Sequence, residues 1–556
     1  MTWVSSLSRA LVLGFLFAGG CSLCSAQEGK LPEGPHWGGG NFQPTAANSV
    51  FATGDGCSLC HSAAPTARAL WSATGQDVSP YGLWRGSLMA HAARDPYWKA
   101  QVAKEVSLAP DRAAELEGTC VRCHAPMGHH TNRLSGLGSM GMKEATSHDL
   151  YVDGVSCTVC HQIQPDSLGT EARFDGNADI RTGRTIFGPY ADPGGQPMIM
   201  HSAFTPTQGE HIRSAGLCAT CHTLRTEHAG KQFPEQSAFF EWQNSIYVDQ
   251  PQVTAASRTC QQCHMPEVGP MRVARNPGGL DFNIETRNEV RGHTFVGGNA
   301  FMLDLLAANR DQLKIATPKE LLEQAARATR SQLAHRTATI AVEGIKHETD
   351  GVGKKTLCFD VVVTNMTGHK FPTGFPSRRA WVQVDVREGR DTIFSSGKPD
   401  ESGRINGIAD ELNEPHHDVI TSPEQVCIYE LLAADGEGKP TTVLTHMATR
   451  RKDTRLLPFG YSNSGPRVAE TSPVGIGDDA NFLGGSDHVT YKVAMPEGAS
   501  TRQTIVARLY YQPIPPAWAD TLRNVRSADA KSFVKMYDAA KAAPEQIAVT
   551  VEFAQE

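Results

Sequence analysis

The chain has 556 residues, a formal net charge of −7, 14 cysteines and 21 histidines. A mild negative charge spread along the sequence argues against a nucleic-acid-binding protein, because such proteins need a concentrated basic surface. The length is enough for two to four domains. After the first residues no apolar stretch approaches the ~20 residues that a membrane-spanning helix requires, so we expect no transmembrane segment in the mature protein.

Residues 1–26 have the pattern of a secretory signal peptide. A single charge at Arg9 precedes the apolar run 10–18, and small residues follow as far as Ala26. The run is too short to span a bilayer, so we expect cleavage after Ala26 and a periplasmic or exported protein. Cys21 follows Ala-Gly-Gly and loosely resembles a lipoprotein site, but the usual leucine three residues earlier is missing. A lipid anchor at Cys21 is therefore the less favoured alternative.

Five Cys-x-x-Cys-His motifs follow. Composition alone predicts roughly 0.01 such strings, so their number is not accidental. The spacing is that of covalent c-type haem attachment, in which two thiols add to the porphyrin vinyl groups and the histidine becomes the proximal iron ligand. Zinc ribbons also use paired Cys-x-x-Cys knuckles, but they do not require a histidine after every second cysteine. The motif residues are Cys57, Cys60 and His61; Cys120, Cys123 and His124; Cys157, Cys160 and His161; Cys218, Cys221 and His222; and Cys260, Cys263 and His264.

The motifs predict five covalently bound haem c groups, with iron as the metal. We assign residues 27–299 to a pentahaem cytochrome c domain, because this part is rich in Gly, Pro and His and has little apolar periodicity. Such a composition fits a domain whose interior is porphyrin more than aliphatic side chains. Within it, the string 84–87 (WRGS) recurs as 242–245 (WQNS), which is weak support for an internal repeat.

The surplus histidines are candidates for the second face of each iron. A low-spin electron-transfer haem takes a histidine there, whereas a catalytic haem leaves that face open. His129 and His130 follow the second motif closely, and either one of them reaches a neighbouring haem or both are loop residues. The predicted distal ligands in this domain are His91, His148, His201 and His293.

Residues 300–336 are predicted to form a helical linker. One helix is expected over about 299–313. A second begins at 317–320 (TPKE), where a capping box has proline at the first helical position, and it ends near His335.

From residue 337 to 556 the sequence predicts an immunoglobulin-like β-sandwich. Short segments that alternate or cluster β-branched and aromatic residues lie between turn signals, and a helical insertion at 528–542 precedes the last one. The fold class is therefore multidomain, a mostly α, loop-rich multihaem cytochrome c domain followed by an all-β sandwich. The expected strands cover 337–342, 357–364, 380–386, 426–431, 489–495, 504–511 and 547–553.

His369 is a further candidate iron ligand, although it lies in the β domain. The turn 365–381 contains two glycines and two prolines, and such a rigid turn can hold an imidazole against a haem across the domain boundary. We favour ligation over a structural turn whose histidine bonds only to backbone.

Two other groups in the β domain leave alternatives open. Cys358 and Cys427 either form a disulfide or are two buried apolar residues. The string 416–418 (HHD), with Glu411 and Glu414, is a candidate metal site, but an acidic, solvated loop is the favoured interpretation.

Several strings resemble the multihaem c-type cytochromes related to the tetrahaem cytochromes of nitrifying bacteria and to hydroxylamine oxidoreductase, including members with a C-terminal β domain. The resemblance implies closely packed haems in parallel and perpendicular pairs, with histidines on both faces of most irons. The count of five is below the eight of the oxidoreductases, and no motif has lysine in place of the proximal histidine, as in related pentahaem nitrite reductases. Both departures argue against nitrite or hydroxylamine chemistry. The strings that carry the resemblance are 87–96, 153–162, 217–224, 260–266, 292–299 and 368–374.

Electron transfer is the leading functional hypothesis: the haems form a chain between periplasmic or membrane redox partner proteins. The alternative is an oxidoreductase that acts on a small nitrogen, sulfur or peroxide substrate at one open-faced haem. The supply of histidines favours the electron carrier, and no catalytic residue is predicted. The β domain is a candidate docking module in either case.

Overall fold

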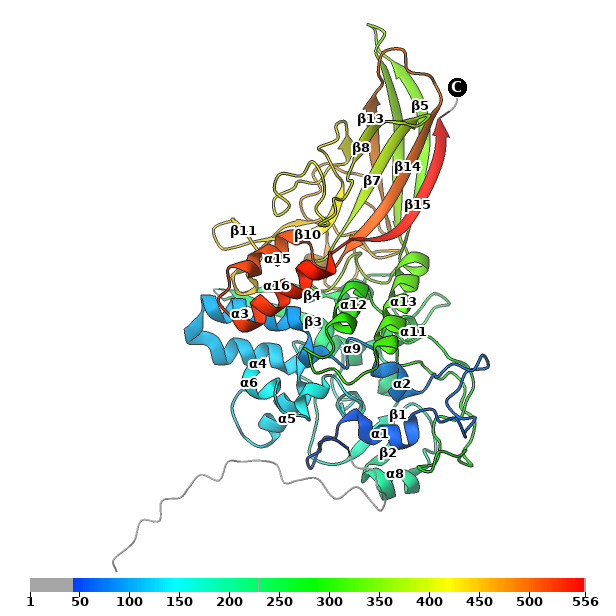
Figure 1. Cartoon of the computed structure of the whole chain (residues 1–556), viewed down its shortest axis with the longest axis vertical. Coiled ribbons are helices and arrows are strands. Elements are labelled where there is room, and N and C mark those ends of the chain that lie inside the picture. The colour runs from blue at the N-terminus through cyan, green and yellow to red at the C-terminus, as the bar shows by residue number, and fades with distance from the viewer. Residues whose placement is uncertain (1–43, 229, 555–556) are drawn as a thin grey trace, which may run out of the picture.

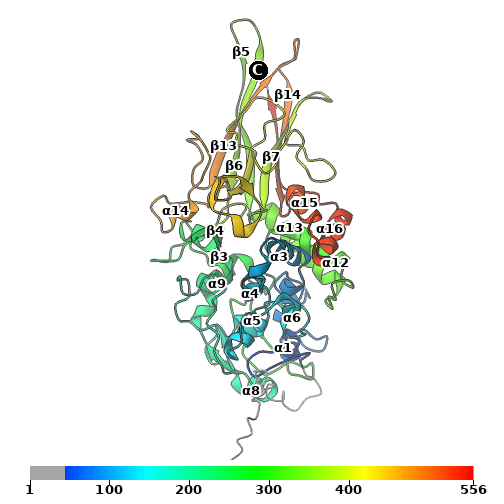
Figure 2. The same cartoon turned by 90° about the vertical axis from the view of Figure 1, so that its left-hand side faces the viewer.

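The computed structural model describes residues 44–228 and 230–554 as an elongated molecule (Figures 1 and 2). The N-terminal part forms one end, the β domain forms the other, and a helical layer lies between them. The predicted signal peptide, 1–26, and Cys21 lie outside the described residues.

Short helices joined by long loops make up the N-terminal part, as predicted. Two small sheets were not predicted: the parallel pair β1–β2 and the antiparallel hairpin β3–β4. The elements are α1 (Gly54–His61), α2 (Pro80–Trp84), α3 (Pro96–Leu108), α4 (Ala113–His124), α5 (Pro126–Leu134), α6 (Met142–Ala145), α7 (Cys157–Cys160), β1 (Thr185–Gly188), α8 (Gly195–Ser202), β2 (Thr205–Gln208), α9 (Ala215–His222), β3 (Thr223–His228), β4 (Lys231–Ser237), α10 (Ala238–Gln243) and α11 (Cys260–His264).

The apolar side chains of this part form several small clusters. One surrounds Val121 and Met127, another Phe239 and Phe240, and a third Leu70. A domain of this size ordinarily builds one contiguous core. The separate clusters indicate that something other than side chains fills the interior.

The predicted linker is an integral packed layer. Its helices α12 (Ala300–Ala308) and α13 (Lys319–Arg336) share one apolar cluster with α3 and with the C-terminal helices α15 (Pro516–Arg523) and α16 (Ala528–Ala540). Phe301 meets Tyr537 edge-on with ring centroids 5.6 Å apart, and Tyr97 lies 5.0 Å from Phe533. Helices α15 and α16, which follow β14 of the β domain, therefore pack against the helices at the boundary between the two parts. The predicted helical insertion before the last strand is confirmed as α16.

The predicted capping box is wrong, although its helix is confirmed. Pro318 is the N-cap residue and the helix begins at Lys319, with no side-chain capping bond. The Thr317 hydroxyl instead donates to the carbonyl of Arg85, 3.0 Å away. The Thr317 hydroxyl, which the local sequence predicted as the helix cap, thus makes a tertiary hydrogen bond in place of the capping bond.

All seven predicted strands are confirmed in the β domain, and four short strands were missed because they are brief or polar. One sheet has the order β5-β6-β13-β9. The other has the order β11-β10-β7-β14-β15, with β8 beside β7 and β12 beside β10. The elements are β5 (Ala338–Thr349), β6 (Lys355–Asn365), β7 (Arg379–Glu388), β8 (Asp391–Ser396), β9 (Val419–Ile420), β10 (Ile428–Ala434), β11 (Pro440–Thr441), β12 (Thr449–Asp453), α14 (Val468–Thr471), β13 (Ser486–Ala494), β14 (Gln503–Gln512) and β15 (Glu545–Ala554).

The two sheets share one hydrophobic core. Alternate residues of facing strands, such as Val361 of β6 and Val384 of β7, are fully buried in it. Cys358 and Cys427 are both buried and both free thiols, so the disulfide alternative is not realised.

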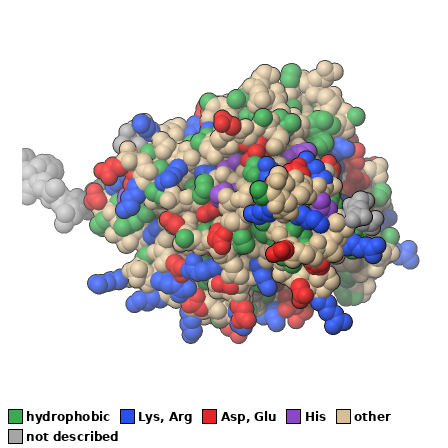
Figure 3. All heavy atoms as spheres, turned by 90° about the horizontal axis from the view of Figure 1, so that it is seen from above, with side chains coloured by type: hydrophobic (Ala, Val, Ile, Leu, Met, Phe, Trp, Pro, Cys, Tyr) green, Lys and Arg blue, Asp and Glu red, His purple; other side chains and the backbone are tan. Residues whose placement is uncertain are grey.

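Basic and acidic side chains are interspersed on the face seen from the β-domain end (Figure 3). This matches the even spread of charge along the sequence. None of the helices in the described ranges has the length and apolarity needed to cross a membrane.

Candidate cofactor-binding site

Each Cys-x-x-Cys-His motif forms the last turn of a short helix. In α1, α4, α9 and α11 the final helical residue is the motif histidine, and α7 ends one residue before His161. Side chains at positions i, i+3 and i+4 of a helix share one face. The two thiols and the imidazole of each motif therefore point the same way.

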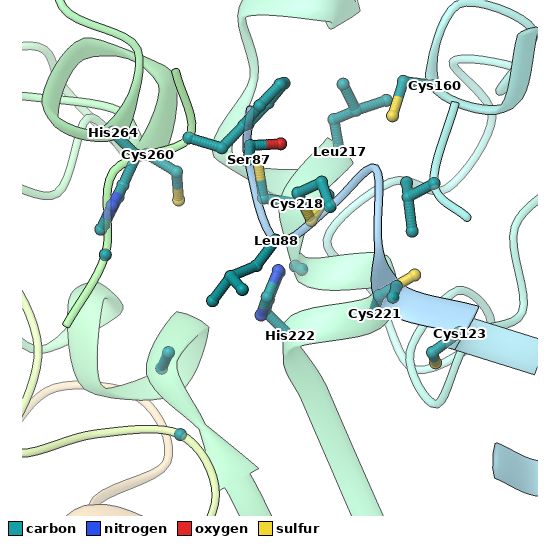
Figure 4. Close-up of a pocket in the computed structure, with 18 of the residues that line it drawn as sticks. Ser87, Leu88, Cys123, Cys160, Leu217, Cys218, Cys221, His222, Cys260 and His264 are labelled. Atoms are coloured by element: carbon teal, nitrogen blue, oxygen red, sulfur yellow. The ribbon is translucent and has the colours of Figure 1, made fainter. Parts of the chain in front are cut away.

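These five faces line one shared cavity of about 1490 Å³. A pocket for a single drug-sized ligand measures about 300–1,000 Å³, so this cavity exceeds what one small molecule needs. All five motif histidines and nine of the ten motif cysteines line it, Cys60 being the exception. Figure 4 shows the sulfurs of five of them around the opening, together with two imidazoles: Cys123, Cys160, Cys218, Cys221, Cys260, His222 and His264.

Cysteines of different motifs touch one another, and these contacts reveal which motifs are neighbours. The first motif meets the third, the second meets the fourth, and the fourth also meets the fifth. Cys160 of the third motif is among the groups that raise the pKa of both cysteines of the fourth motif, so the third motif also lies near the fourth. The thiol pairs in contact are Cys57 with Cys157, Cys123 with Cys221, and Cys218 with Cys260.

Backbone carbonyls fix the tautomer of four motif histidines. In each case Nδ1–H donates to a carbonyl oxygen, which leaves Nε2 available as a metal ligand. The donor–acceptor pairs are His61 with Val273 (2.9 Å), His124 with Ala92 (3.1 Å), His161 with Phe187 (2.6 Å) and His264 with Val296.

Burial favours the neutral form of four motif imidazoles, those of His61, His124, His161 and His222. It lowers the pKa of His124 and His222 to about 4, and it also lowers the pKa of His61 and His161. A histidine must be neutral to ligate a metal, so the site is arranged for ligation at physiological pH.

His293 lies against the third motif. Its ring centroid is 6.2 Å from that of His161, with 18° between the ring planes. Its Nδ1 donates to the Arg291 carbonyl at 3.1 Å, and burial lowers the pKa of His293 to about 3. The sequence prediction and the geometry agree in bringing His293 to the cavity.

His369 crosses the domain boundary and lies against the fifth motif. Its ring centroid is 6.2 Å from that of His264, with 17° between the planes. The Nδ1 atom donates to the carbonyl of Lys370 at 2.8 Å, so Nε2 is again available. The residue lines the cavity, as the ligand prediction requires.

Buried charges hold the loop that carries His369. The Lys370 N–H donates to the carboxylate of Glu241 on α10, 3.0 Å away, and the Lys370 ammonium lies 2.7 Å from Asp453. Arg455 lies 3.2 Å from Glu241. Glu241 belongs to the N-terminal part, whereas the other residues belong to the β domain, so this network joins the two parts beside the cavity.

The other three predicted ligands do not line the cavity. His91 is buried, but its Nε2 donates to the carbonyl of Arg85 at 3.0 Å. His148 is exposed after the short helix α6, and its Nδ1 accepts the Leu150 N–H at 3.2 Å. His201 is half-buried on α8. Their ligand roles stay predictions.

His130 does line the cavity, and the sequence singled it out only together with His129. It is almost fully buried on α5, directly after the second motif. Its Nδ1 accepts a hydrogen bond from Arg133 at 3.2 Å, and its Nε2 has no partner within the described residues. Proximity to the motif was the available signal, but it did not distinguish the two adjacent histidines.

Comparison by sequence with known protein families and with curated proteins finds no match. Among solved structures, the chain is similar to a penta-heme cytochrome c552 from Thermochromatium tepidum. The TM-score is 0.50 at 16% identity, over 85% of this chain and 95% of that chain. The chain shares the fold of this cytochrome.

The repeated Trp-x-x-Ser strings have the same structural role in both copies. The Trp84 indole N–H donates to the carbonyl of Val155, and the Trp242 indole N–H donates to that of Arg258. Each acceptor lies two residues before the first cysteine of a motif. The repeat therefore anchors the third and fifth motifs in the same way.

Glu235 is a buried carboxyl group in the cavity wall. It is 3% exposed, and its Oε2 has no partner within the described residues. Burial first, and then the charges of Glu105 and Asp175, raise the pKa of Glu235 to about 8 from an ordinary 4.5. The folded protein thus keeps a proton that the unfolded chain loses.

Glu235→Gln is expected to stabilise the protein increasingly as pH rises. The unfolded carboxyl ionises near pH 4.5 and the folded one near pH 8, so wild-type stability falls across this window. The variant removes that loss, which is on the order of 4 kcal/mol at pH 8. Thermal melting of both proteins from pH 4.5 to 9 measures the difference. The matched control is Glu285→Gln, at a side chain that is 82% exposed; a parallel pH trend in both variants would contradict the assignment.

Proposed function

We propose that the protein is a pentahaem c-type cytochrome that transfers electrons between periplasmic or membrane redox partners. The observation that carries the proposal is the convergence of all five motif faces on one cavity. The shared fold with a penta-heme cytochrome adds support. When bound, haem iron supplies one-electron redox chemistry.

The residues of the cavity fit covalently attached haem. Each motif offers two thiols and an imidazole on one face, and four of the imidazoles have Nδ1 engaged and Nε2 free. For the third and fifth motifs, a second imidazole lies with its ring centroid 6.2 Å from the first. A metal bound at about 2 Å by a nitrogen of each ring separates such centroids by roughly 6 Å. This spacing supports His293 and His369 as distal ligands.

The contacts between motifs support a branched arrangement of the five sites. The first motif adjoins the third, and the second, third and fifth adjoin the fourth. The fourth motif then lies where three branches meet. Electrons that enter at different sites have a common route through it, which suits a carrier with more than one partner.

A second candidate function is an oxidoreductase with one open-faced haem. Within the described residues, His61, His124 and His222 have no second histidine ring at the separation found for the other two motifs. His124 packs parallel to Trp98 with centroids 4.5 Å apart, which is too close for a metal between the two rings. The missing second imidazole is compatible with an iron face that accepts a small molecule.

The strand order supports our interpretation of the β domain as an immunoglobulin-like sandwich. Strands β5, β6 and β13 adjoin in one sheet and β7, β14 and β15 in the other, which is the A-B-E and C-F-G order of immunoglobulin constant domains. Such a domain commonly presents loops for docking. The relation to the nitrifier cytochromes remains a prediction.

Haem counting tests the proposal. The protein expressed with a c-type haem maturation system is expected to gain the mass of five haems that denaturant and acidified acetone do not remove. A Cys218→Ser, Cys221→Ser double variant is expected to carry four. Metal analysis that finds zinc and no iron in the purified chain would exclude haem. Cyanide binding by the oxidised protein favours the open-faced enzyme, and its absence favours the carrier.

A further inference from the structure

A second group of ionisable side chains lies in the β domain, outside the residues that line the cavity. His416 precedes β9, Asp479 lies in the segment before β13, and Asp487 lies in β13 itself. One potential ligand atom of each side chain lies within 4.8 Å of the others. Three segments of the β domain thus bring a nitrogen and two carboxylates to one point.

The three side chains are buried, and two of them, His416 and Asp487, each keep one ring or carboxylate atom without a partner within the described residues. Asp479 Oδ1 accepts the backbone N–H groups of Asn481 and Phe482 at 3.1 and 3.0 Å. Asp479 is fully buried, Asp487 is likewise, and His416 is 2% exposed at its side chain. Nε2 of His416 lies 2.8 Å from Asp479, which leaves its Nδ1 without a partner within the described residues. Asp487 accepts the Tyr429 hydroxyl at 2.9 Å through Oδ2, whereas its Oδ1 has no partner in the same ranges.

No lysine or arginine within the described residues forms an ion pair with either aspartate. Lys452, whose charge reaches His416, is engaged elsewhere: its ammonium lies 2.9 Å from Glu430 and donates to the backbone carbonyls of residues 414 and 415. Burying carboxylates without a cation is costly, so buried charges are normally paired or coordinate a metal. The cluster therefore offers the ligand atoms of a cation site. No lysine or arginine within the described residues takes the place of a bound cation there.

We propose that His416, Asp479 and Asp487 bind a divalent cation of the zinc class. Imidazole selects transition metals over Mg²⁺ and Ca²⁺, which prefer all-oxygen shells. Zn²⁺ is commonly held by histidine and carboxylate ligands in this number. Asp418, half-buried beside the cluster and bonded by Asn481 at 3.4 Å, lies close enough for the Asp479 charge to act on it.

The adjacent residues His416 and His417, which the sequence placed in one candidate metal site, have different partners in the structure. His417 lies 2.9 Å from Glu414, and Glu411 pairs with Arg379 at 3.2 Å. The partners of His416 come instead from residues more than sixty positions away. His417 is therefore a matched control: an adjacent histidine, also paired with a carboxylate, outside the proposed site.

Metal binding by the intact holoprotein tests the proposal. After dialysis against EDTA and then against Zn²⁺ and metal-free buffer, the wild type is expected to retain one zinc per chain, measured by plasma mass spectrometry against amino-acid analysis. His416→Ala and Asp487→Asn are expected to retain at least tenfold less, and His417→Ala is expected to match the wild type. Equal retention by wild type and Asp487→Asn would overturn the proposal.

Thermal melting of the wild type gives a second readout, which does not depend on whether any variant folds. Because a cation that binds only the folded state stabilises it, EDTA is expected to lower the wild-type Tm by about 5 °C. EDTA is expected to leave the Tm of Asp487→Asn unchanged. A wild-type Tm that does not respond to EDTA or to added Zn²⁺ would show that the cluster is only a hydrogen-bond network. Neither readout depends on the number of haems, so this proposal fails independently of the proposed function.

Discussion

Asp453→Ala is expected to lower the free energy of unfolding by about 3–5 kcal/mol, because it removes one partner from a buried ion network. Asp453 is fully buried and lies 2.7 Å from Lys370 and 2.8 Å from Arg455. The variant leaves both cations buried with less compensation, next to the loop that carries His369. Thermal or denaturant unfolding of the holoprotein, followed by far-UV circular dichroism, measures the loss.

The matched control is Asp538→Ala, which removes an aspartate at the same 2.8 Å from an arginine, Arg523, but with a side chain that is 50% exposed. Exposed pairs contribute ~0–1 kcal/mol. Equal losses in the two variants would show that burial of the Asp453 network has no energetic consequence.

The effect of Asp453 should also depend on pH. Burial raises the pKa of Asp453, but the charges of Arg455 and then Lys370 lower it more, so the pKa lies well below its usual range. A carboxyl with a depressed folded pKa contributes its full stability above the unfolded pKa, here 3.8, and loses it as pH falls. The difference between wild type and Asp453→Ala is therefore expected to be constant above pH 5 and to shrink below pH 4.

The elements that the sequence predicted well are those whose signal is local. The β-domain strands alternate buried and outward residues, as in β6 around Val361, and this pattern needs no knowledge of the partner strand. The hairpin β3–β4 was missed because its buried positions include Glu235 and Ser237. Polar residues are buried there because the strand forms part of the cavity wall. The sequence therefore lacks the alternation of apolar and polar residues that predicts a strand.

The motif residues were predictable from their spacing, whereas the histidines opposite them were predicted only in part: His293 and His369 line the cavity, and His91, His148 and His201 do not. A Cys-x-x-Cys-His string carries its geometry within one helical turn. A distal histidine is chosen by how loops fold back from elsewhere: His369 meets His264 from 105 positions further along the chain. The Glu241–Lys370 contact that holds this loop joins two parts of the fold, and neither residue stands out in its own segment. His148 had a suitable position in the sequence, but it lies on the surface.

His369→Ala and His293→Ala are each expected to convert one haem from a six-coordinate low-spin state to a state that binds cyanide, without loss of covalent haem. Each substitution removes the second imidazole that lies 6.2 Å from a motif histidine. The thiols that attach the porphyrin are untouched, so mass spectrometry is expected to report an unchanged haem count. Electron paramagnetic resonance of the oxidised proteins is expected to show one additional high-spin signal per variant.

The control is His148→Ala, because His148 is exposed and bonds only to its own turn. We expect its low-spin signals to match those of the wild type. New high-spin signal in His148→Ala, with none in His369→Ala, would contradict the ligand assignment.

Comparison of His369→Ala with Asp453→Ala separates ligation from loop support. The first variant removes the imidazole but keeps the Lys370–Asp453 pair at 2.7 Å, whereas the second keeps the imidazole and weakens what holds its loop. If His369 acts as a ligand, His369→Ala changes the spectrum at all temperatures below unfolding. Asp453→Ala is then expected to change the same signal only as the loop melts. An identical, temperature-independent change in both variants would mean that the loop positions the fifth motif without ligating its metal.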